Sequence, residues 1–193
     1  MATIQILIEG YAQKNSIGWV ASSTTCLITS GDTKIITDPG CNREKLLSAL
    51  RSHGVTTNDI DYVFMSHCHL DHILLAGIFE RAKCITYDSN FIYNNDTLVE
   101  FEPHTLGAEI EIIETPGHVL EHISLIVDTA EGAVGIAGDA IWWLDDEDQV
   151  FDVQQPDHSQ AKGMDRAVLI ESRKKLIEKS VYIIPGHGKM FKV

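Results

Sequence analysis

The stretch IDYVFMSHCHLDH, residues 60–72, decides most of what the sequence says about fold and chemistry. The apolar run at its start predicts a buried β-strand. Alternate residues of an extended chain point to the same side, so His67 and His69 can reach one ion together. Asp71 and His72 follow where the chain turns, at a different offset, and can face a neighbouring position. Imidazole suits zinc and iron, and carboxylate suits harder ions, so this stretch predicts a metal site.

Three further polar residues follow strand-like runs, each in a turn that contains glycine. His118 lies in TPGHV, Asp139 in GIAGDA and His187 in IIPGHG. Loops at strand ends are where a rigid scaffold displays chemistry, and glycine lets the backbone turn sharply beside a ligand. Any one of them could be an ordinary turn residue. Together with residues 67–72, they complete a set of metal ligands.

The length and composition predict one globular domain over residues 1–193. The chain is 44% apolar and 22% charged, which is typical of a globular protein and leaves no long polar tract. No apolar run approaches the roughly 20 residues that span a bilayer. The first ten residues lack a basic region and carry Glu9, which argues against a secretory signal. The four cysteines form no C-x-x-C pair, so we expect free thiols and a cytoplasmic protein.

The net charge of -13 argues against a nucleic-acid partner, because proteins that clamp polyanions usually carry a basic patch. The densest basic cluster, residues 173–175, is interpreted as a solvated helix face. The acidic run LDDEDQ, residues 144–149, follows Asp139 closely and would repel a long polyanion. We expect a small-molecule substrate and no membrane partner. The sequence carries no signal for an oligomeric state.

The first half of the chain predicts a strand, a hairpin, a capped helix, a buried strand and a second helix. The expected ranges are strand 3–9, hairpin strands 24–30 and 33–38, helix 42–54, strand 60–66 and helix 73–82. Asn42 is a candidate N-cap and Gly54 a candidate residue just past the helix end.

The second half repeats the pattern of strands followed by a helix. The expected ranges are strands 108–115, 122–129 and 132–139, helix 160–180, and strand 181–188. Near one face of the last helix we expect Ala161, Met164, Val168 and Leu176. Two such halves imply two packed sheets with helices on the outer faces, a mixed α/β architecture.

HCHLDH, TPGHV, GDA and PGHG, in that order, resemble the H-x-H-x-D-H, His, Asp, His signature of the metallo-β-lactamase superfamily. TDPG, residues 37–40, is similar to the first motif of that family. The resemblance runs from about residue 20 to residue 188 and implies an αββα sandwich of two mixed sheets flanked by helices, with the site at one edge.

The resemblance also implies roles for the candidate residues. One metal would be held by His67, His69 and His118, a second by Asp71, His72 and His187, with Asp139 as the bridge and Asp38 as a supporting hydrogen-bond partner. An aspartate at the bridging position, where β-lactam-cleaving members carry cysteine or serine, indicates the broader branch of thioesterases, lactonases and phosphodiesterases.

These assignments predict two divalent ions, expected to be zinc, with iron or manganese as alternatives. The expected reaction is metal-assisted hydrolysis by a bridging hydroxide, with Asp71 and Asp139 as catalytic residues that hold the ions or accept hydrogen bonds. The leading substrate class is a small ester, thioester or lactone. The alternative is a phosphodiesterase or a compact nuclease of the same fold.

Two other classes stay open beside these hydrolases. A redox di-iron member is disfavoured because such proteins carry glutamate where this chain has His69. A non-catalytic scaffold is disfavoured because every ligand position is filled.

The remaining candidates have weaker interpretations. Cys68 is expected to pack away from the ligands, and His122 to begin a strand rather than line the pocket. Trp142 and Trp143 could bind an apolar acyl group or belong to the core. No role is expected for three other histidines, His53, His104 and His158.

Overall fold

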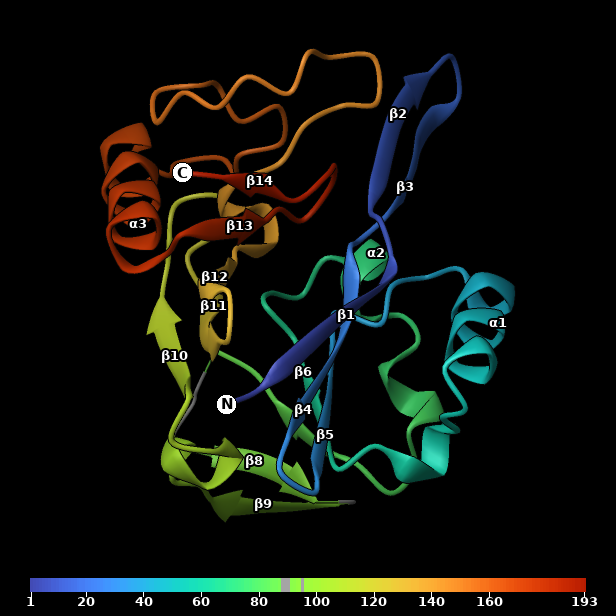
Figure 1. Ribbon diagram of the computed structural model, residues 1–193. Helices are drawn as coiled ribbons and strands as arrows, with labels where there is room; N and C mark the ends of the chain where they lie inside the picture. Colours follow the sequence, from blue (N-terminus) through green and yellow to red (C-terminus); the bar gives the residue numbers. More distant parts are fainter. Residues whose placement is uncertain (88–90, 95) are drawn as a thin grey trace.

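The computed structural model describes residues 1–87, 91–94 and 96–193. Two β-sheets pack face to face, with α1 beside the first sheet and α3 beside the second (Figure 1). The first sheet has the order β1-β4-β5-β6-β7-β8-β9, the second β10-β11-β12-β13-β14, and β2 pairs with β3 in a separate ribbon. This confirms the expected αββα sandwich.

The elements have the following bounds. The first sheet contains β1 (Thr3–Ile8), β4 (Thr25–Ser30), β5 (Thr33–Thr37), β6 (Tyr62–Phe64), β7 (Lys83–Ile85), β8 (Phe91–Asn94) and β9 (Thr97–Glu100). The second contains β10 (Ile110–Glu114), β11 (Ile123–Thr129), β12 (Gly132–Ile136), β13 (Tyr182–Ile184) and β14 (Phe191–Lys192), and the ribbon contains β2 (Tyr11–Asn15) and β3 (Gly18–Ser22). The α-helices are α1 (Arg43–Ser52), α2 (Leu70–Ile73) and α3 (Arg166–Lys179), and short 3-10 turns are η1 (Thr57–Asp59), η2 (Ala76–Ile78), η3 (Pro103–Leu106) and η4 (Gly138–Ala140).

Three apolar layers hold the sandwich together. Between the sheets lie side chains such as Ile28, Phe64 and Leu125. Leu46 of α1 packs on the outer face of the first sheet, and Leu176 of α3 on the outer face of the second. Burial of these surfaces supplies the main favourable term of folding.

Strand direction brings the ligand-bearing turns to one edge. β5 and β6 are parallel, with Thr37 paired to Phe64, so the segments that follow both strands leave the first sheet together. β12 and β13 are likewise parallel, with Ile136 paired to Ile184. The residues after these four strands include Asp38, His67, Asp139 and His187. Parallel pairing therefore decides that residues distant in sequence meet.

Several local predictions are confirmed by the structure. Asn42 caps α1, because its side chain accepts a hydrogen bond from the amide of Lys45. Gly54, with a φ of 68°, follows the helix in the left-handed region that glycine tolerates. The hairpin of β4 and β5 turns through Gly31 and Asp32 as expected. The β2–β3 ribbon was not among the predicted elements.

The predicted helix over residues 73–82 is wrong. α2 ends at Ile73, and only the 3-10 turn η2 follows it. The amide of Leu75 donates to the carbonyl oxygen of Gly40 at 3.1 Å, and the amide of Gly40 donates to that of His72 at 2.8 Å. The backbone groups at this helix end thus bond to the loop after β5, so α2 stays short.

The predicted helix over residues 160–180 begins later than expected. Asp165 caps α3 through the amide of Ala167, and Gly163 has a φ of 91°, outside helical geometry. Of the expected core face only Leu176 is buried, and Val168 is 37% exposed. No helix in the described part of the chain is long and apolar enough to cross a membrane.

Candidate metal centre

All seven residues predicted as ligands converge at one edge of the sandwich. Ligand atoms of His67, His69, His118 and Asp139 lie within 4.8 Å of one another, and so do those of Asp71, His72 and His187. We call His67, His69 and His118 the His118 cluster, and Asp71, His72 and His187 the His72 cluster.

Asp139 lies between the two clusters and presents one carboxylate oxygen to each. Oδ1 is 3.1 Å from Nε2 of His72 and 3.5 Å from Nε2 of His187. Oδ2 is 3.5 Å from Nε2 of His118 and 3.9 Å from Nε2 of His67. A side chain at Gly186 would collide with Oδ1, so glycine there keeps room for the carboxylate. This placement matches the bridging role predicted for Asp139.

The His118 cluster is oriented by hydrogen bonds to the ring nitrogens that face away from the centre. Nδ1 of His118 lies 2.7 Å from Oδ2 of Asp157, and Nδ1 of His67 lies 3.0 Å from the Ser66 hydroxyl. Nε2 of His118 in turn lies 3.0 Å from Nδ1 of His69. Partners of this kind fix the tautomer and orientation of a metal-binding histidine.

The His72 cluster is oriented from the first sheet and the ribbon. Oδ2 of Asp38 lies 3.1 Å from Nδ1 of His72, while its Oδ1 accepts from the amide of Ser66 at 2.7 Å. Nδ1 of His187 donates to the backbone carbonyl of Tyr11 at 3.1 Å. Asp38 therefore makes the supporting contact predicted for it. Its φ of 38° is strained for a non-glycine residue and is held by these bonds.

Atoms that face the centre lack partners, which tests whether a cation fits. Nε2 of His67, Nε2 of His72 and Oδ1 of Asp139 are buried without a hydrogen-bond partner among the described residues. Leaving such groups unpaired costs roughly 1–3 kcal/mol each. Imidazole nitrogens and carboxylate oxygens form the donor set of a divalent transition-metal ion, so the residues present fit such ions.

Electrostatics separate the two clusters in the metal-free chain. Burial holds the pKa of His67 well below its usual value, and the nearby His72 lowers it further. Burial also lowers the pKa of His69, with a further contribution from His118. Both rings are therefore neutral at physiological pH, which leaves a nitrogen lone pair free for a cation.

The His72 cluster shows the opposite shift. Burial lowers the pKa of His187, but the nearby carboxylates of Asp139 and Asp71 outweigh it and raise that pKa to about 9. The carboxylates of Asp139 and Asp38 likewise outweigh burial and hold the pKa of His72 well above its usual value. Burial raises the pKa of Asp139, but His72 and His187 outweigh it and hold it well below normal. Protons on the two rings thus balance Asp139.

Comparison with known proteins places the chain in a family. The family model of the metallo-beta-lactamase superfamily matches residues 18–85. Metallo-beta-lactamase domain-containing protein 1 of Mus musculus is 32% identical over 200 residues, covering 97% of this chain and 74% of the relative. This chain belongs to the metallo-β-lactamase superfamily. The family, the histidine and aspartate clusters and the fold are together consistent with a metal-dependent hydrolase.

Several solved structures share the fold at low identity. A Thermotoga maritima protein described as a candidate metallo-beta-lactamase superposes with a TM-score of 0.76, at 21% identity, over 100% of this chain and 99% of that one. AidC, a dizinc quorum-quenching lactonase, gives 0.62 at 17% identity over 88% and 74%. A di-iron-bound protein gives 0.63 at 15% identity over 96% and 94%. At these identities the likeness shows the fold.

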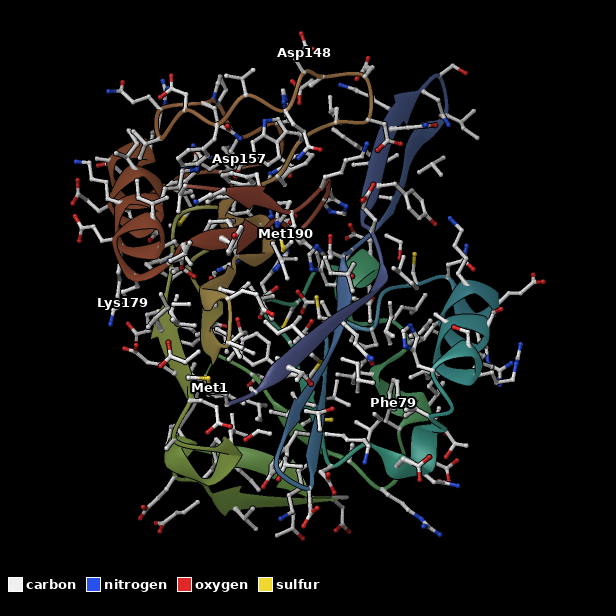
Figure 2. All side chains as sticks on the ribbon, in the orientation of Figure 1. Met1, Phe79, Asp148, Asp157, Lys179 and Met190 are labelled. Atoms are coloured by element: carbon white, nitrogen blue, oxygen red, sulfur yellow. The ribbon has the colours of Figure 1, made fainter. Side chains whose placement is uncertain are left out.

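The sequence reading missed Asp157 of this metallo-β-lactamase-fold chain. Its carboxylate contacts His118 and also accepts from Nε1 of Trp142 at 3.1 Å. Burial raises the pKa of Asp157, but its contact with His118 and its hydrogen bonds to Ser159 and Trp142 together outweigh burial and lower that pKa. In Figure 2, Asp157 lies in the segment between η4 and α3, above β14. No family motif marks this residue; its place beside His158 in a polar loop was the available signal.

The two tryptophans after Asp139 have different environments. Trp142 lines a pocket of about 320 Å³ beside the metal centre, together with Trp19 of β3, and the two rings meet edge to face at 6.3 Å. Trp143 packs in the apolar layer between the second sheet and α3. Trp143 therefore belongs to the core, and binding of an acyl group by Trp142 stays a prediction.

Two other interpretations need correction. Cys68 does not pack in the interior; it is exposed. Arg173 does not belong to a solvated helix face, because its side chain is fully buried. The alternation of side chains predicted that Cys68 points away from His67 and His69. The strand β6 ends at Phe64, however, so the side of the chain that Cys68 occupies faces solvent.

Of the remaining histidines whose side chains are described, one lies beside the centre and two lie outside it. The strand β11 starts at Ile123, directly after His122, as expected, yet the buried ring of His122 stacks on His67 at 5.1 Å. His53 ends α1 and is exposed, and His158 pairs with Glu147 at 2.8 Å. The side chain of His104 lies outside the described residues.

Proposed function

We propose that this chain is a hydrolase that holds two divalent metal ions, one on each histidine cluster, and cleaves a small ester, thioester or lactone. One observation carries the proposal: the buried carboxylate of Asp139 turns one oxygen toward each cluster. Such ions would supply Lewis acidity and a water of lowered pKa. We propose zinc as the native metal, with iron or manganese as alternatives that the same donor set accommodates.

The residues of the chain would divide the remaining work. Asp139 keeps the two clusters at a fixed separation. Asp71 lines the pocket. Burial raises the pKa of Asp71, but its hydrogen bond to His187 and the nearby His72 together outweigh burial, so that the pKa lies below its usual value. An ionised Asp71 at the pocket floor can accept a hydrogen bond from a nucleophilic water. Asp38 and Asp157 hold histidines of the two clusters in place.

The pocket supports a small substrate without a formal negative charge. Its described lining is apolar or aromatic at Ala12, Trp19, Leu70 and Trp142, and it includes no lysine or arginine. An anionic phosphodiester would find no basic side chain there. The segment 144–149 stays acidic beside the ribbon, where the amide of Asp145 donates to the carbonyl of Ala12 at 2.9 Å. Asp148, at its outer edge in Figure 2, is exposed.

The test combines elemental analysis with a substrate panel on the full chain. We expect about two metal equivalents, turnover of apolar acyl thioesters or lactones, and loss of turnover with a chelator. Bis-phosphodiesters and short RNA should be turned over far more slowly. Faster cleavage of RNA than of any thioester or lactone would contradict the proposed substrate class, and fewer than two bound ions would contradict the proposed centre.

A further inference from the structure

Helix α3 carries an arginine on its buried face. The buried residues of α3 are Leu169, Ser172, Arg173 and Leu176, at the spacing that forms one helix face. The two leucines join the apolar layer against the second sheet. Arg173 is 0% exposed, although arginine is almost never fully buried unless it is paired. A buried guanidinium is costly unless its N–H groups find acceptors. Nε and Nη1 of Arg173 find them, while Nη2 is buried without a hydrogen-bond partner among the described residues.

The described contacts of the Arg173 guanidinium are all to backbone carbonyls. Nε donates to the carbonyl oxygen of Ala140 at 2.7 Å. Nη1 donates to the carbonyl oxygen of Gln155 at 2.6 Å and to that of Val153 at 3.2 Å. A guanidinium is planar and rigid, so these bonds set the distance between the η4 turn and the segment 153–155.

Both segments lead directly to the metal centre. Ala140 follows Asp139, whose carboxylate lies between the clusters. Gln155 lies two residues before Asp157, which contacts Nδ1 of His118 at 2.7 Å. The neighbouring Ser172 donates to the carbonyl oxygen of Pro116 at 2.6 Å, two residues before His118. One face of α3 thus contacts the segment before Asp157 and the segment before His118.

The His72 cluster is held from other elements. Asp38, after β5, orients His72, and the carbonyl of Tyr11 in β2 orients His187. Neither contact involves α3. Loss of the Arg173 contacts should therefore weaken metal binding at the His118 cluster more than at the His72 cluster. A general loss of stability would weaken metal binding at both clusters.

We propose that Arg173 is a positioning residue for the His118 cluster. Through the carbonyls of Val153 and Gln155 it holds the segment that carries Asp157, whose carboxylate contacts His118. The inference rests on the proposed two-metal centre. It assigns the support of the His118 cluster to a single buried side chain. Arg173 does not touch the ions or the substrate.

The test titrates the metal-free full chain with Co²⁺ and follows absorbance and heat for the wild type, Arg173→Met, Arg173→Lys and Lys174→Met. Lys174 is an exposed neighbour that pairs with Glu171, so its variant is the matched control. We expect two equivalents in the wild type and in Lys174→Met. In Arg173→Met, one equivalent should bind about 10–100-fold more weakly, the usual effect of losing an outer partner, while the other stays near wild type. Arg173→Lys should be intermediate, because an ammonium cannot reach both carbonyl sets at once.

Equal weakening of both equivalents in Arg173→Met, or no weakening, would overturn the positioning role. If Arg173→Met does not fold, Arg173→Lys decides, because it keeps the positive charge and changes the reach and geometry of the donors. Weaker binding of one equivalent alone in that variant supports the role, and wild-type affinity for both, or equal weakening of both, overturns it. A wild-type chain that binds fewer than two equivalents would refute the metal centre itself, a result that these variants cannot produce.

Discussion

Nε2 of His72 and Oδ1 of Asp139 lie 3.1 Å apart at the centre of the site, and both atoms are buried without a hydrogen-bond partner among the described residues. The ring comes from α2 and the carboxylate from η4, and these two helical turns follow strands of different sheets. Their approach joins the two halves of the chain at one point. A cation held there would satisfy both atoms, for which the described part of the protein supplies no hydrogen-bond partner.

Replacing Asp139 by alanine should abolish hydrolysis and release at least one metal ion, because both clusters lose the carboxylate between them. Elemental analysis and turnover of a thioester or lactone measure the two effects. Asp128→Ala is the matched control, since Asp128 is an exposed aspartate of the same sheet. Unchanged turnover or metal content in Asp139→Ala would contradict the bridging role.

Replacing Asp38 by alanine should weaken metal binding at the His72 cluster. Nδ1 of His72 would lose its carboxylate partner, and the amide and hydroxyl of Ser66 would lose their acceptors. We expect metal affinity to fall about 10–100-fold, as is usual for partners of ligating histidines. Isothermal titration of the metal-free variant checks this. The idea fails if the affinities of both sites match those of the wild type.

The metal-free protein should lose stability as the pH rises from about 6 to about 10. The pKa of His187 is raised to about 9 from a usual value of 6.5, so protonated His187 stabilises the folded state below 6.5 and this contribution disappears as the pH passes through 9. The loss should be on the order of a few kcal/mol. Urea unfolding in the presence of chelator measures it. His187→Gln should flatten the profile, and an equally steep profile in that variant would exclude His187 as the source.

At the acid end the sign is reversed. The pKa of Asp139 is held well below its usual value of 3.8, so its contribution is present above that value and is lost as the pH falls further. Below the usual pKa of 6.5, the buried neutral rings of His67 and His69 also favour unfolding, because they are protonated more readily in the unfolded chain. We therefore expect the greatest stability of the metal-free form at about pH 6.5. Thermal melts as a function of pH should show a maximum there; a maximum above pH 9 would disagree with these shifts.

Removing Trp19 should alter substrate binding more than metal binding. Trp19 is 46% exposed and packs edge to face on Trp142 in the pocket wall, away from the ligand atoms. Trp19→Ala should raise KM for an apolar acyl substrate by about tenfold, the effect of roughly 1–2 kcal/mol of lost contact, with metal content unchanged. Trp19→Phe should retain most of the affinity. An unaltered KM of Trp19→Ala for acyl chains of different size would show that Trp19 does not contact the substrate.

Bound metal should stabilise the fold. Ions that bind the folded chain and not the unfolded one raise the midpoint of thermal unfolding, by an amount that grows with the logarithm of the free ion concentration divided by Kd. A chelator should therefore lower Tm, and added zinc should restore it. Added zinc should restore Tm less in Asp139→Ala than in Asp128→Ala. Equal recovery of Tm in the two variants would show that Asp139 does not contribute to metal binding.

The sequence by itself determined which residues are candidate ligands and the type of fold. Close spacing within residues 67–72 identified four candidate ligands, and glycine turns after apolar runs marked His118, Asp139 and His187. Periodicity and caps predicted most strands and α1. These features depend on short-range geometry, which the order of residues specifies directly.

Only the tertiary structure decided which backbone groups and side chains meet. The helix predicted after His72 stops because its amides bond to the loop at Gly40, a contact between segments about thirty residues apart. Asp157 reaches His118, and Arg173 becomes buried, because α3 packs on the second sheet and the segment before it folds over the site. Partners of this kind have no periodicity in the sequence, since long-range packing and parallel strand pairing alone bring them together.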